Sequence, residues 1–481
     1  MQYISTRGGE GERPLGFTDV TLRGLAGDGG LYVPESWPQI GPGEIAGFAG
    51  QPFEDVATRV IAPFAGAALA AGTVRRLAAA AMATFAHPAK TPLVQIDRNH
   101  FLLELFHGPT LAFKDVAMQF LARLLDHILE ERGARTTVIV ATSGDTGAAA
   151  AEAFRGRRAI DLVILYPHGR ISEVQRRQMT TVAEDNVHAL AIEGTFDDCQ
   201  ALVKAMFMDE RLRRDLDLSG VNSINWARIV AQITYYFVAA AALGAPHRKV
   251  AFSVPTGNFG DIYAGYAARR MGLPVERLII ATNTNDILHR MLATGRYAKG
   301  EVTPTFSPSM DIQVASNFER LLFEAAGRDA GAVRAMMQAL AADGAFALPA
   351  PALAAIRDSF ASGAVSEAET TATIAATHAA TGLIVDPHTA VGIAAARRAG
   401  AGAGGGAGAG DEATPVVTRA TAHPAKFPDA VERACGVRPA LPARFESILQ
   451  APERTRRLPA DLAAVAAAVR AASRVSAGAA A

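Results

Sequence analysis

The sequence predicts an α/β protein built on parallel sheets, and three observations support this fold class. Short apolar runs rich in Val and Ile alternate with helical segments from residue 101 to about residue 282. The loops between them are short and rich in Gly, Ser and Thr. The chain has 481 residues, half of them hydrophobic, which is too long for one compact core and predicts two or three domains. In such sheets, ligands lie beyond the carboxyl ends of the strands.

The expected elements follow from this periodicity. The segment 226–243, for example, has Ile229, Val230, Ile233 and Phe237 on one face of a helix. The expected strands are 136–141, 162–166, 187–192, 250–255 and 278–282. The expected helices are 115–128, 148–154, 226–243, 261–271 and one that begins near residue 196.

Composition excludes several classes of protein. Lys plus Arg and Asp plus Glu both number 47, so nothing in the overall charge indicates a nucleic acid or an acidic membrane as partner. The two cysteines, Cys199 and Cys435, cannot form a disulfide framework and predict reduced thiols in a cytoplasmic protein. Charges interrupt the apolar runs before about 18 residues, so we expect no membrane span.

Lys114 has unusually apolar neighbours for a lysine. It follows Leu111, Ala112 and Phe113 and begins a helical pattern. Burial and the positive end of a helix dipole both favour a neutral amine, the form required for a Schiff base. The alternative is that Lys114 begins a helix and extends its ammonium group to solvent. Without further context, this second arrangement is the more common one for a lysine.

Three loops could bind anions, although each also has a simpler explanation. Residues 256–261, Thr-Gly-Asn-Phe-Gly-Asp, precede a helix and could hold a phosphate, or form an ordinary turn. Residues 143–147 could bind a carboxylate, or Ser143 or Asp145 could cap the helix. Residues 222–228 could grip a dianion, or Asn222 or Asn225 could cap a helix with Arg228 in solvent. No His, Cys and Asp cluster has the spacing of a metal site.

The motifs together resemble the threonine synthase family of pyridoxal-phosphate enzymes. The resemblance runs from residue 3 to residue 427 in the family's order and includes nine segments. They are Tyr3-Ile-Ser-Thr-Arg-Gly, His107-Gly-Pro-Thr-Leu-Ala-Phe-Lys-Asp, Thr142-Ser-Gly-Asp-Thr-Gly, Ile171-Ser-Glu-Val-Gln-Arg-Arg-Gln-Met-Thr-Thr, Gly194-Thr-Phe-Asp-Asp-Cys-Gln, Asn222-Ser-Ile-Asn-Trp-Ala-Arg, Gly257-Asn-Phe-Gly-Asp, Met310-Asp-Ile-Gln-Val-Ala-Ser-Asn-Phe-Glu-Arg and Thr421-Ala-His-Pro-Ala-Lys-Phe.

The resemblance implies fold type II, the tryptophan synthase β-like fold, with parallel sheets flanked by helices and an additional N-terminal domain. It implies that Lys114 binds pyridoxal 5'-phosphate covalently, that Phe113 packs beside the cofactor and that Thr421 bonds its pyridine nitrogen. The implied holders of the cofactor phosphate are Gly257, Asn258, Phe259, Gly260 and Asp261. The implied substrate residues are Ser143, Asp145 and Thr146 for the carboxylate and Asn222, Ser223 and Arg228 for the phosphate.

The resemblance also implies a reaction and a domain division. The family converts O-phospho-L-homoserine and water to L-threonine and phosphate, by γ-elimination and then β-addition, as the last step of threonine biosynthesis. We expect a monomer or homodimer. The alternatives are a serine/threonine dehydratase of the same fold or a non-catalytic phosphometabolite-binding relative. The expected parts are an N-terminal domain (1–99), a large cofactor domain (100–135 and 235–455), a smaller substrate domain (136–234), a flexible Gly/Ala loop (399–410) and an Ala-rich tail (456–481) with one helix.

Overall fold

The computed structural model describes residues 1–9, 11–400 and 414–475. Most of the Gly/Ala segment expected to be a flexible loop, and the last six residues of the Ala-rich tail, lie outside the described residues. Among the described residues, no helix has both the length and the hydropathy needed to cross a membrane.

A small N-terminal unit begins the chain. Its antiparallel sheet has the order β2-β1-β3, with β1 at Gln2–Ser5, β2 at Leu15–Gly16 and β3 at Tyr32–Pro34. Its helices are α1 (Phe17–Arg23), α2 (Pro42–Ala46), α3 (Phe53–Ala65) and α4 (Ala71–Met82). The helix α3 packs on α10 (Trp226–Ala242), which joins this unit to the rest of the molecule.

The larger sheet has six strands in the described residues, in the order β14-β11-β10-β15-β5-β4. All neighbours are parallel except β4 and β5. The strands are β4 (Leu93–Asp97), β5 (His100–Glu104), β10 (Val250–Pro255), β11 (Val275–Thr282), β14 (Phe360–Ala364) and β15 (Val416–Ala420). The helices between and after these strands are α11 (Gly260–Arg270), α12 (Ile287–Thr294), α13 (Phe318–Ala325), α14 (Ala330–Ala342), α15 (Ala350–Ser359), α16 (Glu367–Thr381), α17 (Pro387–Arg398) and α18 (Pro428–Cys435). A separate two-stranded antiparallel sheet consists of β12 (Arg296–Ala298) and β13 (Ala345–Ala347), which are distant in the sequence.

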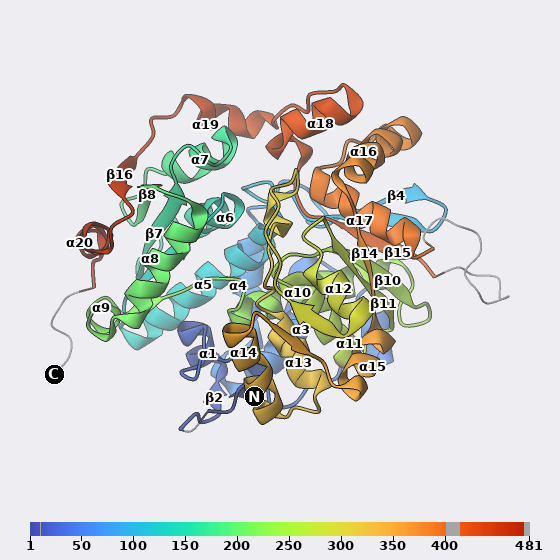
Figure 1. Cartoon of the computed structure of the whole chain (residues 1–481), viewed down its shortest axis with the longest axis horizontal. Helices are drawn as coiled ribbons and strands as arrows, with labels where there is room; N and C mark the ends of the chain where they lie inside the picture. The colour runs from blue at the N-terminus through green and yellow to red at the C-terminus, as the bar shows by residue number, and fades with distance from the viewer. Residues whose placement is uncertain (10, 401–413, 476–481) are drawn as a thin grey trace.

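The smaller sheet is fully parallel, with the order β16-β8-β7-β6-β9. Its strands are β6 (Thr136–Ala141), β7 (Ile160–Pro167), β8 (Val187–Glu193), β9 (Leu218–Ser219) and β16 (Thr455–Pro459). The helices connected to it are α6 (Asp145–Phe154), α7 (Glu173–Thr180), α8 (Phe196–Met208), α9 (Glu210–Asp215), α19 (Glu446–Gln450) and α20 (Leu462–Ala472). Figure 1 shows β16 and α20 at the outer side of this sheet, far from the larger sheet on the right.

The C-terminal segment therefore corrects one expectation. The sequence predicts a single helix in an Ala-rich tail, whereas the structure also has a strand whose residues Thr455–Pro459 pair with Ala189–Glu193. The helix α20 then buries Val465 and Val469 in an apolar cluster with Leu202 and Met206 of α8. Since β8 would otherwise be an edge strand, the tail covers an exposed sheet edge.

Two long helices lie between the sheets (Figure 1). They are α5 (Lys114–Arg132) and α10, and they pack against each other. Both are buried on most faces, which explains why each is apolar well beyond one stripe. The expected strands and helices are all present; strands 136–141 and 250–255 have the expected limits, and the limits of the others differ by at most four residues.

Candidate active site

A cavity of about 1180 Å³ lies where the strands of both sheets end. The loops that follow β6, β10 and β15 enter it, because carboxyl ends of parallel strands meet at one edge. The expected site residues that line it are Phe113, Lys114, Asp145, Thr146, Asn222, Ser223, Arg228, Gly257, Asn258, Phe259, Gly260, Asp261 and Thr421.

 Thirteen of the fourteen residues expected from the sequence thus line one cavity, and Ser143 does not.

Lys114 is the first residue of α5, and its side chain is only 12% exposed. Its Nζ lies 3.3 Å from Oδ2 of Asp145 and 5.0 Å from the centre of the Phe113 ring. Burial lowers the pKa of Lys114, and the nearby cations Lys426 and Arg228 act in the same direction against the attraction of Asp145. The amine therefore loses its proton more readily than a surface lysine, as the helix-start position predicts.

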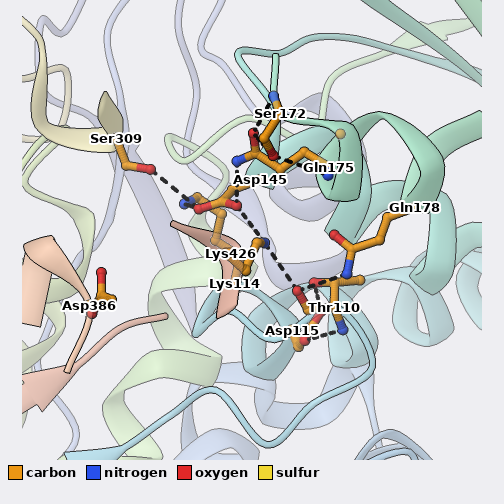
Figure 2. A network of polar contacts seen from close by, with 12 residues as sticks. Thr110, Lys114, Asp115, Asp145, Ser172, Gln175, Gln178, Ser309, Asp386 and Lys426 are labelled. Atoms are coloured by element: carbon orange, nitrogen blue, oxygen red, sulfur yellow. Dashed lines mark hydrogen bonds and ion pairs between the residues drawn. The ribbon is translucent and has the colours of Figure 1, made fainter. Parts of the chain in front are cut away.

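Asp145 is the centre of a polar network that the sequence did not reveal (Figure 2). Its Oδ1 lies 2.5 Å from Nζ of Lys426 and accepts a hydrogen bond of 2.9 Å from Nε2 of Gln175. Its Oδ2 accepts from Lys114 and from Oγ of Ser309, each at 3.3 Å. Burial opposes ionisation of Asp145, but the two lysines outweigh it and hold the pKa of Asp145 well below its usual range.

These contacts change the role expected for Asp145. Its carboxylate is anionic and already surrounded by donors, so its side chain is poorly suited to bind a substrate carboxylate. The N-terminus of α6, which begins at Asp145, offers backbone N–H groups for that purpose. Thr146, in the first turn of α6, lines the cavity.

Ser143 is exposed and does not cap α6. Instead, Oγ1 of Thr142 accepts hydrogen bonds from the backbone N–H groups of Gly144 (2.9 Å) and Gly147 (2.8 Å). The hydroxyl that organises this loop is therefore the buried one, because only a buried threonine can reach both amides from within the turn.

The loop after β10 has the shape of a phosphate cradle. A Cβ at Gly257 would lie 2.5 Å from the carbonyl oxygen of Ser309, so only glycine fits there. Phe259 has a φ of 65°, a left-handed conformation that costs energy for a residue other than glycine. The helix α11 follows at once and directs the positive end of its dipole at the loop.

The carboxylate of Asp261 interacts with three buried side chains. Its Oδ1 accepts hydrogen bonds from the hydroxyls of Tyr235 (2.8 Å) and Tyr236 (3.2 Å) and lies 3.5 Å from Nη2 of Arg419. Arg419 is fully buried, with its guanidinium 4.1 Å and 3.6 Å from the ring centres of the two tyrosines. The carboxylate thus belongs to a buried cluster beneath the loop, and the loop's backbone remains available to an anion.

Arg228 lies in the first turn of α10 and is 4% exposed. Asn225 caps this helix by accepting from the N–H of Ala227 at 3.0 Å, so the capping explanation holds for Asn225 while Arg228 is not in solvent. The guanidinium donates to the carbonyl oxygen of Val221 at 3.2 Å, and no carboxylate of the described residues pairs with it. Burial lowers the pKa of Arg228 to about 10. A buried cation without a counter-ion requires an anionic ligand.

Thr421 immediately follows β15, and its backbone carbonyl accepts a hydrogen bond of 2.8 Å from the N–H of Phe113. Its side chain is 6% exposed, lines the cavity and makes no hydrogen bond with the described residues. A hydroxyl in this position is free to bind a ring nitrogen. Asn222 and Ser223 lie at the cavity wall beside Arg228.

Several residues in or beside the cavity were not expected from the sequence. The N-terminal unit, which holds none of the expected site residues, contributes the segment 23–27. His388, at the start of α17, bonds Asp386 through Nδ1 at 2.7 Å and accepts the Ser309 N–H through Nε2 at 3.2 Å. Lys426 was visible only as a member of the Thr421-Ala-His-Pro-Ala-Lys-Phe motif, and its burial could not be inferred from its neighbours.

The arrangement fits pyridoxal phosphate on structural grounds. Three groups lie around one cavity. They are the buried amine of Lys114 with its lowered pKa, the hydroxyl of Thr421, and the loop at Gly257, which requires glycine and precedes the N-terminus of α11. These groups would hold an aldehyde carbon, a ring nitrogen and a phosphate, respectively. The fold and the site together define a pyridoxal-phosphate-dependent enzyme.

Comparison with known proteins gives the particular family. The family model "Pyridoxal-phosphate dependent enzyme" matches residues 84–376, and the models "Threonine synthase N terminus" and "Threonine synthase, C-terminal" match residues 2–82 and 389–469. The threonine synthase of Pseudomonas aeruginosa is 52% identical over 97% of each chain, and that of Corynebacterium glutamicum is 40% identical over 97% of each chain.

Solved structures agree. The pyridoxal-phosphate-bound threonine synthase from Brucella melitensis superimposes with a TM-score of 0.94 at 54% identity, covering 98% of this chain and 100% of that one. The yeast threonine synthase gives a TM-score of 0.91 at 38% identity, covering 98% of both chains. This chain belongs to the threonine synthase family, so the predicted family, fold type and cofactor are confirmed.

Proposed function

We propose that this protein converts O-phospho-L-homoserine and water to L-threonine and phosphate. The observation that carries the proposal is Arg228, a buried cation without a carboxylate partner among the described residues, in the same cavity as the buried amine of Lys114. An enzyme that acted on an unphosphorylated amino acid would need no such cation. Membership of the threonine synthase family supports the same reaction.

We propose that Lys114 moves the protons of the reaction. When bound, pyridoxal phosphate supplies an electron sink for the carbanions that form on the substrate. The Nζ of Lys114, which burial keeps ready to lose a proton, removes the proton from Cα and exchanges protons with Cβ and Cγ. Asp145, held by Lys426 and Gln175, keeps this amine at the cavity wall.

Arg228, with Asn222 and Ser223, binds the substrate phosphate and stabilises its charge as it leaves Cγ. Without the phosphate, the buried guanidinium of Arg228 would be left without an anionic partner, so homoserine is excluded. Water then adds at Cβ. The N-terminus of α6, with Thr146, receives the substrate carboxylate.

The two alternatives have less support. A serine/threonine dehydratase requires no second anion site, which leaves the burial of Arg228 unexplained. A non-catalytic phosphometabolite-binding relative requires no reactive lysine, which leaves Lys114 unexplained.

We propose a reducing, cytoplasmic location and a monomer or homodimer. The two cysteines support the location, since both Cys199 and Cys435 are free thiols. Cell fractionation and light scattering of the purified protein test the two statements.

The decisive experiment measures phosphate release from O-phospho-L-homoserine and identifies the amino acid produced. We expect equimolar phosphate and threonine, and no reaction with homoserine. Phosphate accompanied by a different amino acid would refute the assignment. Borohydride reduction followed by peptide mapping should place the cofactor on Lys114, and an adduct on another lysine would remove Lys114 from its role.

A further inference from the structure

Gln232 is a buried residue whose amide has no hydrogen-bond partner among the residues that the structure describes. It lies on α10, one helical turn after Arg228, and is 3% exposed. Its side chain lines the same cavity and makes no hydrogen bond with the described residues. A polar group that faces a cavity without a protein partner is available to a ligand or water bound there.

The helix places this amide between two anion sites. Residues 228, 232 and 235 are four and three positions apart and share one face of α10. At one end of this row is the guanidinium of Arg228. At the other end is Tyr235, whose hydroxyl donates to Oδ1 of Asp261, in the loop that cradles a phosphate.

The two elements are also in direct contact. A Cβ built on Gly260 would lie 3.6 Å from Cδ1 of Ile229, so α10 passes close to the phosphate loop at this level. Figure 1 shows α10 and α11 next to each other near the centre of the molecule. A glutamine at position 232 is therefore within the part of the cavity where phosphate groups are expected.

We propose that Gln232 donates a side-chain N–H group to a phosphate oxygen bound in this cavity. The inference rests on the proposed function, which puts a cofactor phosphate on the loop 257–261 and a substrate phosphate beside Arg228. Either phosphate offers the same acceptor chemistry. A neutral donor suits the position, because it bonds an anion without repelling the adjacent guanidinium.

Three variants separate the hydrogen bond from mere packing. Gln232→Leu keeps most of the volume and removes the donor, and Gln232→Glu keeps the shape and adds a negative charge. Gln232→Asn keeps the amide but shortens the side chain by one methylene group. The matched control is Gln119→Glu, a buried glutamine of α5 that does not line the cavity and that accepts from Arg123 at 2.6 Å.

Two equilibrium measurements do not depend on turnover. The first is the affinity of the cofactor-free protein for pyridoxal phosphate and for pyridoxal, which lacks the phosphate. The second is the affinity of the holoenzyme for inorganic phosphate, measured by calorimetry. Each hydrogen bond to a charged group is worth about 10-fold to 100-fold in affinity, and the glutamate should have the larger effect.

The two measurements also identify the source of the phosphate. If the cofactor phosphate is the acceptor, affinity for pyridoxal phosphate falls about 10-fold or more while affinity for pyridoxal does not. If the substrate phosphate is the acceptor, inorganic phosphate binds more weakly, and KM for O-phospho-L-homoserine rises by a larger factor than kcat falls.

Unchanged affinities for both phosphates in the leucine and glutamate variants would overturn the inference. So would equal losses for pyridoxal and pyridoxal phosphate, or the same losses in Gln119→Glu, since these indicate a general effect on folding. Failure of the wild-type protein to produce threonine would refute the proposed reaction instead, and the two binding measurements would still decide the role of Gln232.

Discussion

The Nζ of Lys426 lies 2.5 Å from Oδ1 of Asp145, and both side chains are almost completely buried. Asp145 therefore has a permanent cationic partner that is independent of Lys114. Covalent attachment of Lys114 to the cofactor would remove one of the two ammonium groups that balance Asp145, and Lys426 would remain. Figure 2 shows the three side chains in one continuous network.

Lys426→Met should strongly destabilise the protein. It leaves the buried carboxylate of Asp145 without its nearest cation, and breaking a buried ion pair costs about 3–5 kcal/mol. The free energy of unfolding in urea measures this loss. Lys249→Met, which breaks an exposed pair with Glu276, should cost less than about 1 kcal/mol and serves as the control.

The double variant Lys426→Met/Asp145→Asn should recover part of the lost stability, because it removes the unpaired charge. The folded-state pKa of Asp145 lies below its ordinary value of 3.8, so the stability due to ionised Asp145 is present above that pH and is lost as the pH falls through the folded-state pKa. Equal stability of the two variants at neutral pH would show that the ion pair does not account for the effect.

Arg228→Ala should lower kcat/KM for O-phospho-L-homoserine about 100-fold, corresponding to the loss of roughly 3 kcal/mol from a charged contact. The absorption spectrum of the bound cofactor should not change, because Arg228 is assigned to the other phosphate. Steady-state kinetics and spectra check both parts. Arg59→Ala, at an exposed pair with Glu44, is the control, and an unchanged rate would exclude Arg228 from the site.

Arg419→Met should weaken binding of pyridoxal phosphate about 10-fold. The substitution leaves Asp261 as a buried negative charge beneath the phosphate loop, and this charge repels the cofactor phosphate. Titration of the cofactor-free protein measures the affinity. Adding Asp261→Asn should restore much of it, whereas a double variant as weak as the single one would indicate a packing defect around the two tyrosines.

Stability should decrease between pH 6.5 and pH 4. Burial, assisted by Arg397, lowers the pKa of His100 from 6.5 to about 4, so the unfolded chain binds a proton in this range that the folded protein does not. Protonation of His100 lowers the free energy of unfolding by up to about 3 kcal/mol, at about 1.36 kcal/mol per pKa unit.

His100→Gln should reduce this pH dependence, and the exposed His247→Gln should not. Part of the dependence should persist in His100→Gln, because burial also lowers the pKa of His423 to about 4. Urea unfolding at several pH values measures the slope. An identical slope in the His100 variant and the wild type would contradict the assignment.

The sequence was most informative about local structure. The apolar periodicity of 226–243 and the Val- and Ile-rich run 136–141 predict α10 and β6 nearly to the residue, because neighbouring residues alone determine these patterns. The pairing of β16 with β8 could not be predicted, because Thr455 and Ala189 are brought together only by the folded chain. The sequence offered Ser143 or Asp145 as a cap of α6, but neither caps it, and the loop amides bond the buried Thr142, which only burial distinguishes from the adjacent Ser143.

The sequence by itself determined the fold class, the family and the position of the reactive lysine, because ordered motifs along the chain carry that information. The tertiary structure decided which charges face one another. Burial and contacts between distant segments determine the pairing of Lys426 with Asp145, the pairing of Arg419 with Asp261 and the position of the buried Gln232. Electrostatic interactions depend on distance in space and on exclusion of water, and both are set by the folded structure and cannot be read from the order of residues along the chain.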